Sequence, residues 1–298
     1  MPVDVNELKS YIADCGKRVD TALDACLPRP NRRPATIHKA MRHSVFAGGK
    51  RLRPVLCLAA TEACGGDSEN ALPAACAVEM LHTYSLVHDD LPCMDDDDLR
   101  RGRPTCHKVF GEGMAVLCGD ALLTEAFAVL ARIRPTPRYR AGDFVGELAE
   151  AGGSRKLIGG QVMDLEGEGQ KIDKARLVRI HEAKTAALLT ASLRLGAMSA
   201  NATPAKLDAV TRFGHALGLA FQVIDDILDV TQSSETLGKT AGKDAATDKA
   251  TYPAILGLDA SRREAARLTR SAMRALEPLR GKAMRLRQIA EYLLVREY

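Results

Sequence analysis

Apolar residues recur every three or four positions along most of the chain, which is the spacing of helices that bury one face. One stripe near the N-terminus follows Asp4, a candidate helix cap, and consists of Leu8, Ile12, Cys15, Val19 and Leu23. Another follows Pro204 and consists of Leu207, Val210, Gly214, Leu217 and Phe221. Pro73 suits the first turn of a helix that we expect to run to about residue 90. The pattern therefore predicts a largely helical protein.

Short clusters of glycine and proline separate the expected helices. These breakers stand at Pro28 and Pro30, at Gly65 and Gly66, at 134–137, at Gly167 and Gly169, and at 233–242. No segment has the alternating pattern of a strand, and the sequence contains no Asn-Gly hairpin signal. We therefore expect residues 1–298 to form a single all-α domain, built as one large helical bundle.

Composition narrows the class of protein. Of the 298 residues, 46% are hydrophobic and 27% are charged, which is ordinary for a globular chain and too apolar for general disorder. The formal net charge of +4 is far below that of a dedicated nucleic-acid binder, so we expect no nucleic-acid partner. The 8 cysteines include no C-x-x-C pair, which argues against a zinc module or a disulfide framework.

The sequence shows no targeting or membrane signal of the usual kinds. The first residues do not combine a basic segment with an apolar run, as a secretory signal would. No stretch reaches the ~18 uninterrupted apolar residues of a membrane span. We expect a cytoplasmic protein with free thiols and no membrane span.

The most unusual segment is an acidic run at the end of the helix that begins near Pro73. Residues 88–105 read HDDLPCMDDDDLRRGRPT, so six carboxylates are followed directly by arginines. Neighbouring carboxylates repel by roughly 1 kcal/mol per pair in water and by more when half buried. Most such runs are solvated loops. This one, however, extends a helix on which His82, Ser85 and Asp89 share a face beside apolar positions.

A second acidic group lies in the sequence FQVIDDILD at residues 221–229. Asp225 and Asp229 are four residues apart and stack on one helical face, which Gln222 joins. The apolar stripe that should be core thus turns into carboxylates flanked by Ile and Leu. Because a buried carboxylate is costly without a partner, this pattern favours an ion site over a solvated face.

Two carboxylate groups without His or Cys ligands indicate Mg²⁺, which prefers hard oxygen donors. Mg²⁺ is usually held by one or two carboxylates together with phosphate oxygens and water. The two groups therefore suggest a diphosphate clamped between them. Basic residues that could hold the remaining phosphate charge are Lys50, Arg51, Arg53, Arg100, Arg101, Lys184, Lys239 and Lys249.

These residues together resemble the trans-isoprenyl diphosphate synthases, with a close likeness to the bacterial farnesyl diphosphate synthases. Asp89-Asp90-x4-Asp95 is similar to the first aspartate motif of that family, in its longer form, and Asp225-Asp226-x-x-Asp229 is similar to the second. GGKRLRP at 48–54 and Lys184-Thr185 complete the pattern. A single motif would be weak, but these four in the family's order are highly specific.

The resemblance implies a central active-site cavity within the bundle, and a role for each matching residue. The metal ligands would be Asp89, Asp95, Asp225 and Asp229. They would hold Mg²⁺, with about three ions present when substrate is bound. The allylic diphosphate would be contacted by Arg100, Lys184, Lys239 and Lys249. Isopentenyl diphosphate would be bound by Gly49, Lys50, Arg53, His82 and Arg101. Thr185 and Gln222 would face the reacting carbons, and a homodimer would be the working unit.

The first motif and the helix before it carry two further features, the spacing of Asp95 and the aromatic ring of Tyr84. Asp89 and Asp95 are out of phase on a helix and Pro92 lies between them, so we expect Asp95 to reach the site from a loop. The family resemblance implies that a bulky aromatic residue five positions before the first aspartate limits the length of the product chain. Tyr84, with Ser85 beside it, would therefore set the product at farnesyl diphosphate.

The implied reaction is a Mg²⁺-dependent head-to-tail condensation of isopentenyl diphosphate with dimethylallyl or geranyl diphosphate. The product would be farnesyl diphosphate and the leaving group pyrophosphate. Alternatives within the family are a geranyl or geranylgeranyl diphosphate synthase. A class I terpene cyclase would share the ionisation chemistry but would not need the basic set for isopentenyl diphosphate. An inactive subunit is disfavoured because both aspartate motifs are intact, and a His-Asp phosphohydrolase because no second His-Asp pair occurs.

Overall fold

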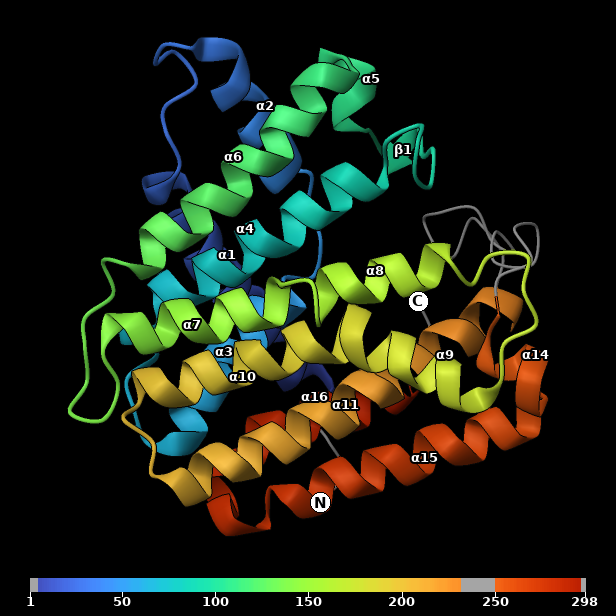
Figure 1. Ribbon diagram of the computed structural model, residues 1–298. Coiled ribbons are helices and arrows are strands. Elements are labelled where there is room, and N and C mark those ends of the chain that lie inside the picture. Colours follow the sequence, from blue (N-terminus) through green and yellow to red (C-terminus); the bar gives the residue numbers. More distant parts are fainter. Residues whose placement is uncertain (1–4, 232–249, 296–298) are drawn as a thin grey trace.

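The computed structural model describes residues 5–231 and 250–295, and within these ranges the protein is a bundle of helices (Figure 1). The prediction of an all-α fold is confirmed. The elements in chain order are α1 (Val5–Cys26), α2 (Ala35–Val45), α3 (Leu52–Cys64), a 3-10 turn (Ser68–Ala71), α4 (Leu72–Asp89), β1 (Leu99–Arg100), β2 (Arg103–Pro104), α5 (Cys106–Phe110), α6 (Glu112–Leu130), α7 (Ala141–Gly152), α8 (Leu157–Leu165), α9 (Lys174–His181), a π-helical turn (Glu182–Ala186), α10 (Ala187–Ser199), α11 (Pro204–Thr231), α14 (Tyr252–Leu256), α15 (Leu258–Ala275), a 3-10 segment (Glu277–Ala283) and α16 (Met284–Val295).

The apolar stripes found in the sequence become the buried faces of helices. In α1, Leu8, Cys15, Val19 and Leu23 are buried, as their spacing predicts. α4 carries Pro73 in its first turn and ends at Asp89, close to the predicted limits. Asp4, the candidate cap of α1, lies outside the described residues.

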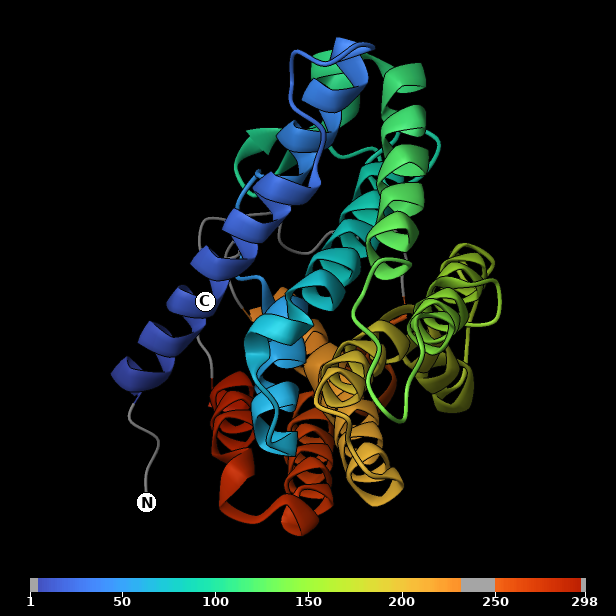
Figure 2. The same ribbon diagram turned by 90° about the vertical axis from the view of Figure 1, so that its left-hand side faces the viewer.

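The core forms where the middle helices meet. α3 and α4 pack against α10, α6 covers α4, and α11 packs between α10 and α15. α4 and α11 both end on the same side of the molecule, where the β1–β2 hairpin also lies (Figures 1 and 2). The two aspartate motifs, at the ends of these two helices, are therefore brought to one end of the bundle.

The short hairpin departs from the prediction that no strand would form. β1 and β2 pair antiparallel, Leu99 with Pro104 and Arg100 with Arg103. Their turn places Arg101 at φ 55° and Gly102 at φ 73°, and two positive φ angles are what a two-residue hairpin turn of type I′ requires. Arginine is an unusual residue at the first of these positions, so the turn has no recognisable sequence signal.

α6 is long and apolar enough to span a membrane by length and composition alone. It also carries Asp120 and Glu125 in its interior and packs along α4. We therefore treat it as a core helix of the bundle, although Val116 and Leu117 on one face remain exposed.

Candidate active site

Two adjoining cavities lie beside the C-terminal end of α4. The first, of about 440 Å³, lies between α4 and α8, and its charged lining residues include Asp89 and Lys184. The rest of its lining is largely apolar and includes Leu91, Val116, Leu157, Ile158, Val162 and Leu165. A cavity with both charged and apolar lining suits an amphiphilic ligand with an anionic head and a hydrocarbon tail.

The second cavity has a volume of about 730 Å³ and is lined by Lys50, Arg53, Arg100, Arg101 and Asp225, among others. Asp89 and Asp225 thus line different cavities, but the two share a wall. The residues common to both are Arg53, His82, Leu86 and Thr185. Within the described residues, the single central cavity that the family resemblance implies is therefore divided into two cavities that share these four lining residues.

In each aspartate pair the first carboxylate faces a cavity and the second is buried and already bonded. Asp90 accepts hydrogen bonds from the Arg100 guanidinium, with its Nε at 2.9 Å. Asp226 accepts from the Tyr252 backbone N–H at 2.9 Å. Asp90 and Asp226 therefore hold the structure around the site, which the repeated Asp-Asp letters alone do not reveal.

Asp89 lies where burial works against its negative charge. Burial raises the pKa of Asp89 to about 6, Lys184 opposes that rise, and the neighbouring Asp95 adds to it. The backbone explains the proximity of Asp95, because α4 ends at Asp89 and the Asp95 N–H donates to the Asp89 carbonyl at 2.8 Å. The prediction that Asp95 approaches from a loop is confirmed.

Arg100 lies beside the first motif, as the family pattern implies, but its guanidinium is already engaged. It pairs with Asp90 and, at 3.1 Å, with Asp97. The side chain still lines the second cavity. In this state it neutralises the acidic loop, so contact with a substrate diphosphate would have to compete with these two carboxylates.

The basic residues of the 48–54 segment divide into two roles. Arg51 is buried and pairs with Glu79 and Asp20, each at 2.8 Å, so it ties α3 to α4 and α1. Arg53 instead faces both cavities, and its Nη1 lies 3.2 Å from His82 Nε2. Its buried Nε has no hydrogen-bond partner within the described part of the chain. A donor thus remains for an anionic ligand.

The hairpin brings Arg101 against the glycines that precede Lys50. Arg101 donates to the Gly48 carbonyl, and a Cβ at Gly49 would lie 2.3 Å from its guanidinium carbon. Gly49 also has φ 115°, so a larger residue there would be strained in addition. The family resemblance implies that Gly49 and Arg101 both bind isopentenyl diphosphate, and in the structure the two residues are in contact.

Lys184 and Thr185 lie in the π-helical turn Glu182–Ala186. The turn is wedged between α8 and α11. A Cβ at Gly160 of α8 would come 2.3 Å from the Lys184 nitrogen, and one at Gly218 of α11 would come 2.5 Å from the Ala186 Cα. π-turns inside helices occur often at functional sites. Sequence periodicity gave no sign of this one.

Side chains of the π-turn make specific polar contacts. Lys184 Nζ donates to Asp164 of α8 at 2.6 Å, so Asp164 orients the lysine. Thr185 Oγ1 donates to Gln222 Oε1 at 2.9 Å, and Gln222 Nε2 donates to Asp226 at 3.1 Å. Thr185 and Gln222, which the resemblance implies face the reacting carbons, are thus joined by a direct hydrogen bond.

Tyr84 lines the apolar wall of the first cavity, one turn before Asp89. Its ring meets His88 edge-on, with ring centroids 5.8 Å apart. Its hydroxyl is buried without a hydrogen-bond partner within residues 5–231 and 250–295. Ser85 lies beside it in the cavity wall and donates to the His82 carbonyl at 2.9 Å. Both residues occupy the wall that a hydrocarbon tail would touch.

The last predicted site residues belong to the end of α11 and the segment after it. Asp229 is buried near the end of α11. Lys239 and Lys249 lie outside the described residues. The donors Asp89, Asp95 and Asp225 are all half-buried carboxylates, and such hard oxygen ligands fit Mg²⁺.

Comparisons with known proteins agree with the family resemblance of the site residues. A model of the Polyprenyl synthetase family matches residues 34–288. The chain belongs to this family. A chloroplastic heterodimeric geranylgeranyl pyrophosphate synthase large subunit 1 from Arabidopsis thaliana is 52% identical over 89% of this chain and 73% of its own length. A chloroplastic geranylgeranyl pyrophosphate synthase from Capsicum annuum is 50% identical over 97% and 79%.

Among solved structures, an FPP/GFPP synthase from Zymomonas mobilis superposes with a TM-score of 0.86. It has 35% identity and covers 97% of this chain and 99% of its own. The fold of the Zymomonas mobilis protein therefore matches nearly the whole length of this chain. Family membership confirms the resemblance found in the sequence, whereas the farnesyl product specificity is not confirmed.

Proposed function

We propose that this protein is a short-chain prenyltransferase that condenses isopentenyl diphosphate with allylic diphosphates and makes geranylgeranyl diphosphate. Two features of the site support this reaction: a first cavity with Asp89, a candidate Mg²⁺ ligand, and Lys184 in its lining, and a second, basic cavity at Lys50, Arg53 and Arg101 that shares lining residues with it. A reaction that joins two diphosphate-bearing substrates needs two such spaces in contact. The relatives named above support the geranylgeranyl product.

In this proposal the allylic substrate occupies the first cavity. Its tail lies along the apolar wall that includes Tyr84 and Leu165, and its diphosphate lies near Asp89 and Lys184. Mg²⁺ held by Asp89, Asp95 and Asp225, with Asp229 in support, would neutralise charge on the departing pyrophosphate. Lys184 adds a positive charge that Asp164 holds in place at 2.6 Å.

Isopentenyl diphosphate would occupy the second cavity, with Lys50, Arg53, His82 and Arg101 around its diphosphate. Burial and the nearby guanidinium of Arg53 lower the pKa of His82 well below its usual value, so His82 is neutral and can donate one hydrogen bond without adding charge. Burial lowers the pKa of Arg53 to about 10, which still leaves it protonated at neutral pH.

Bond formation would take place beside Thr185, which lines both cavities. The allylic C–O bond breaks and its electron pair leaves with pyrophosphate. The isopentenyl double bond attacks the resulting allylic cation, and a proton from the adjacent carbon goes to a pyrophosphate oxygen. The Thr185–Gln222 pair presents oxygen dipoles to the cation, and fixing both substrates in register can contribute ~7–11 kcal/mol of the barrier.

A second candidate product is farnesyl diphosphate, and one residue favours it. Tyr84 puts a bulky ring in the wall of the first cavity at the position where the family resemblance implies a stop. The two candidates differ by one five-carbon addition, so the protein's use of farnesyl diphosphate as a primer separates them.

The deciding experiment is a product assay with Mg²⁺, isopentenyl diphosphate and each allylic primer in turn, read by chromatography of the dephosphorylated chains. Consumption of farnesyl diphosphate to a C20 product supports the geranylgeranyl assignment. Accumulation of farnesyl diphosphate without further elongation supports the second candidate. Cyclic hydrocarbon, or no elongation of any primer, contradicts both.

Tyr84 itself can be tested in the same assay. If its ring limits chain growth, Tyr84→Ala lengthens the main product while Tyr84→Phe, which keeps the ring, leaves it unchanged. If Tyr84→Ala leaves the product length unchanged, Tyr84 does not set the limit.

A further inference from the structure

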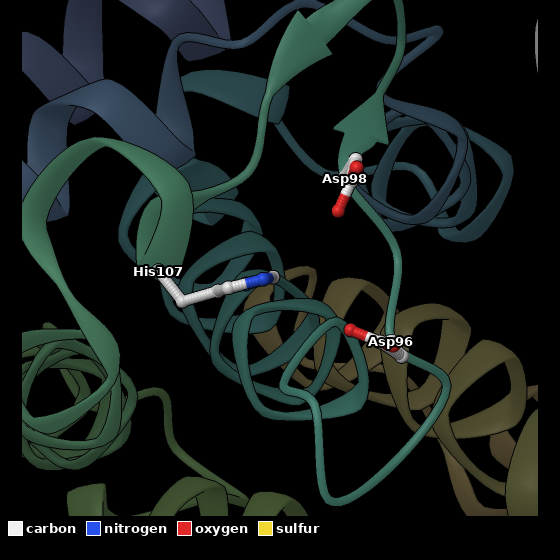
Figure 3. Close-up of side chains that lie close together, drawn as sticks. All are labelled: Asp96, Asp98 and His107. Atoms are coloured by element: carbon white, nitrogen blue, oxygen red, sulfur yellow. The ribbon is translucent and has the colours of Figure 1, made fainter.

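Asp96, Asp98 and His107 come together outside the two cavities of the active site. Their ligand atoms, one from each side chain, all lie within 4.8 Å of one another. Figure 3 shows the His107 ring and the Asp96 carboxylate directed toward each other, with the Asp98 carboxylate beside them. None of the three lines the first or the second cavity.

His107 distinguishes this group from an ordinary acidic loop. The residue is only 6% exposed, and its Nε2 is buried without a hydrogen-bond partner in the part of the chain that the structure describes. A buried nitrogen without a hydrogen-bond partner is destabilising. An atom of this kind aimed at two carboxylates indicates a ligand that the protein side chains do not provide.

The hydrogen bonds of Thr105 set which ring nitrogen can bind. The Thr105 hydroxyl lies 3.3 Å from the Asp98 carbonyl, to which it can only donate, because a carbonyl has no proton. Its lone pair then accepts from His107 Nδ1–H, at 3.2 Å. This leaves the lone pair of Nε2 pointing at the carboxylates, the arrangement in which metal-binding histidines are held by a second hydrogen bond on the other nitrogen.

The backbone positions the two carboxylates before any ion binds. Asp96 adopts φ 48°, and its N–H donates to the Leu91 carbonyl at 3.1 Å. The Asp98 carbonyl accepts from the Thr105 N–H at 3.0 Å, just before β1 begins. The site therefore sits on backbone fixed from both sides, by the end of the α4 loop and by the hairpin.

Charge also favours a cation here. Four carboxylates follow one another at 95–98. Asp97 is neutralised by Arg100 at 3.1 Å, and one oxygen of Asp98 by Lys108 at 2.7 Å. Lys108 also interacts electrostatically with Asp96, so one lysine is shared by these two carboxylates, and Asp98 has a second oxygen to offer.

We propose that Asp96, Asp98 and His107 form a binding site for a divalent transition metal such as Zn²⁺. One imidazole and two carboxylates suit Zn²⁺, Mn²⁺ or Co²⁺, whereas Mg²⁺ and Ca²⁺ prefer oxygen ligands alone. The site shares no ligand with Asp89, Asp95 or Asp225. A bound ion would link the loop that carries Asp95 to α5, and the proposal does not depend on which product the enzyme makes.

The test is Zn²⁺ binding to the full chain in excess Mg²⁺, measured by competition with a chromophoric chelator. We expect one Zn²⁺ per chain, and a loss of affinity of about tenfold or more in Asp96→Asn. Asp96 is exposed, so this variant should fold; Asp120→Asn, on the exposed side of α6, is the matched control and should bind as the wild type does.

A second readout assigns the nitrogen ligand. With ¹⁵N-labelled protein, Zn²⁺ should shift the His107 Nε2 resonance and leave Nδ1 bonded to Thr105, and His107→Gln should weaken binding by about tenfold or more. The proposal is overturned if the wild type binds no Zn²⁺ in excess Mg²⁺. It is equally overturned if Asp96→Asn binds like Asp120→Asn, whatever the stability of the His107 variant.

Discussion

At the scale of single residues, the site separates carboxylates that face a cavity from carboxylates that hold the frame. Asp89 and Asp225 line the cavities, while Asp90 and Asp226 are bonded to Arg100 and to the Tyr252 backbone. The sequence predicted the cavity-facing members through family resemblance. It could not assign the framing members, because adjacent aspartates are chemically identical and only the helix rotation decides which of them is buried.

Thr185 offers a direct test of the reacting region. Thr185→Val keeps the shape of the side chain but removes the donor to Gln222 Oε1. We expect turnover to fall by ~10–100-fold, equivalent to ~1.4–2.8 kcal/mol in the barrier, with little change in KM for either substrate. Thr190→Val, which is not in either cavity, is a suitable control. Unchanged turnover in Thr185→Val would contradict the role given to this pair.

His82 makes the stability of the protein depend on pH. Burial, followed by the charge of Arg53, lowers the pKa of His82 well below 6.5. The unfolded chain therefore takes up a proton on His82 below about pH 6.5, whereas the folded protein does not. The stability that this difference confers is present above that pH and is lost as the pH falls through the window beneath it.

Denaturant unfolding at about pH 8 and about pH 5.5 measures the effect. The wild type should lose more unfolding free energy between the two conditions than His82→Gln, whose side chain does not titrate, by up to ~1.4 kcal/mol for each pH unit within the window. Parallel losses in the two proteins would show that His82 titrates normally in the folded state.

At the scale of elements, regular helices were predictable and local irregularities were not. The apolar spacing that predicts α1, α4 and α11 depends on many residues, so single exceptions do not obscure it. The π-turn at Glu182–Ala186 and the β1–β2 hairpin instead depend on contacts from distant segments. Gly160 and Gly218 leave room for the π-turn because they lack a Cβ. A single glycine in a helical sequence does not show which segment packs against it.

Gly160 therefore tests how the π-turn is held. Gly160→Ala would place a methyl group 2.3 Å from the Lys184 nitrogen, so α8 or the turn must move. We expect a loss of ~1–3 kcal/mol in unfolding free energy and a higher KM for the allylic diphosphate, because Lys184 and Asp164 are displaced together.

Gly146→Ala is the matched control, since Gly146 lies in α7 with no atom within 4 Å of the added Cβ. That exchange should raise stability by up to ~1 kcal/mol and leave the kinetics unchanged. If Gly160→Ala behaves like Gly146→Ala, close packing at Gly160 does not position Lys184.

At the scale of the whole molecule, α5 and α6 leave an apolar surface uncovered. Val109 of α5 is 48% exposed, Val116 and Leu117 of α6 are 42% and 55% exposed, and Val116 also lines the first cavity. The homodimer that the family resemblance implies would cover this face. Under that proposal the wild type has twice the 32.1 kDa chain mass in light scattering, and Leu117→Glu is monomeric.

Met284→Glu provides the control for the charge itself, because Met284 is 50% exposed on a different helix, α16. It should leave the mass unchanged. A monomeric wild type, or a Leu117→Glu variant that keeps the wild-type mass, would exclude α6 as the dimer contact.

The ends of α4 and α11 define the whole molecule's function, because they bring two carboxylate groups to adjoining cavities. A crystal structure with Mg²⁺ and a non-cleavable allylic diphosphate analogue examines this arrangement directly. We predict metal density between the diphosphate and Asp89 and Asp95 on one side, and between the same diphosphate and Asp225 on the other. A bound diphosphate whose metal ions contact only one of the two helices, with Asp225 facing a separate space, would contradict the proposed mechanism.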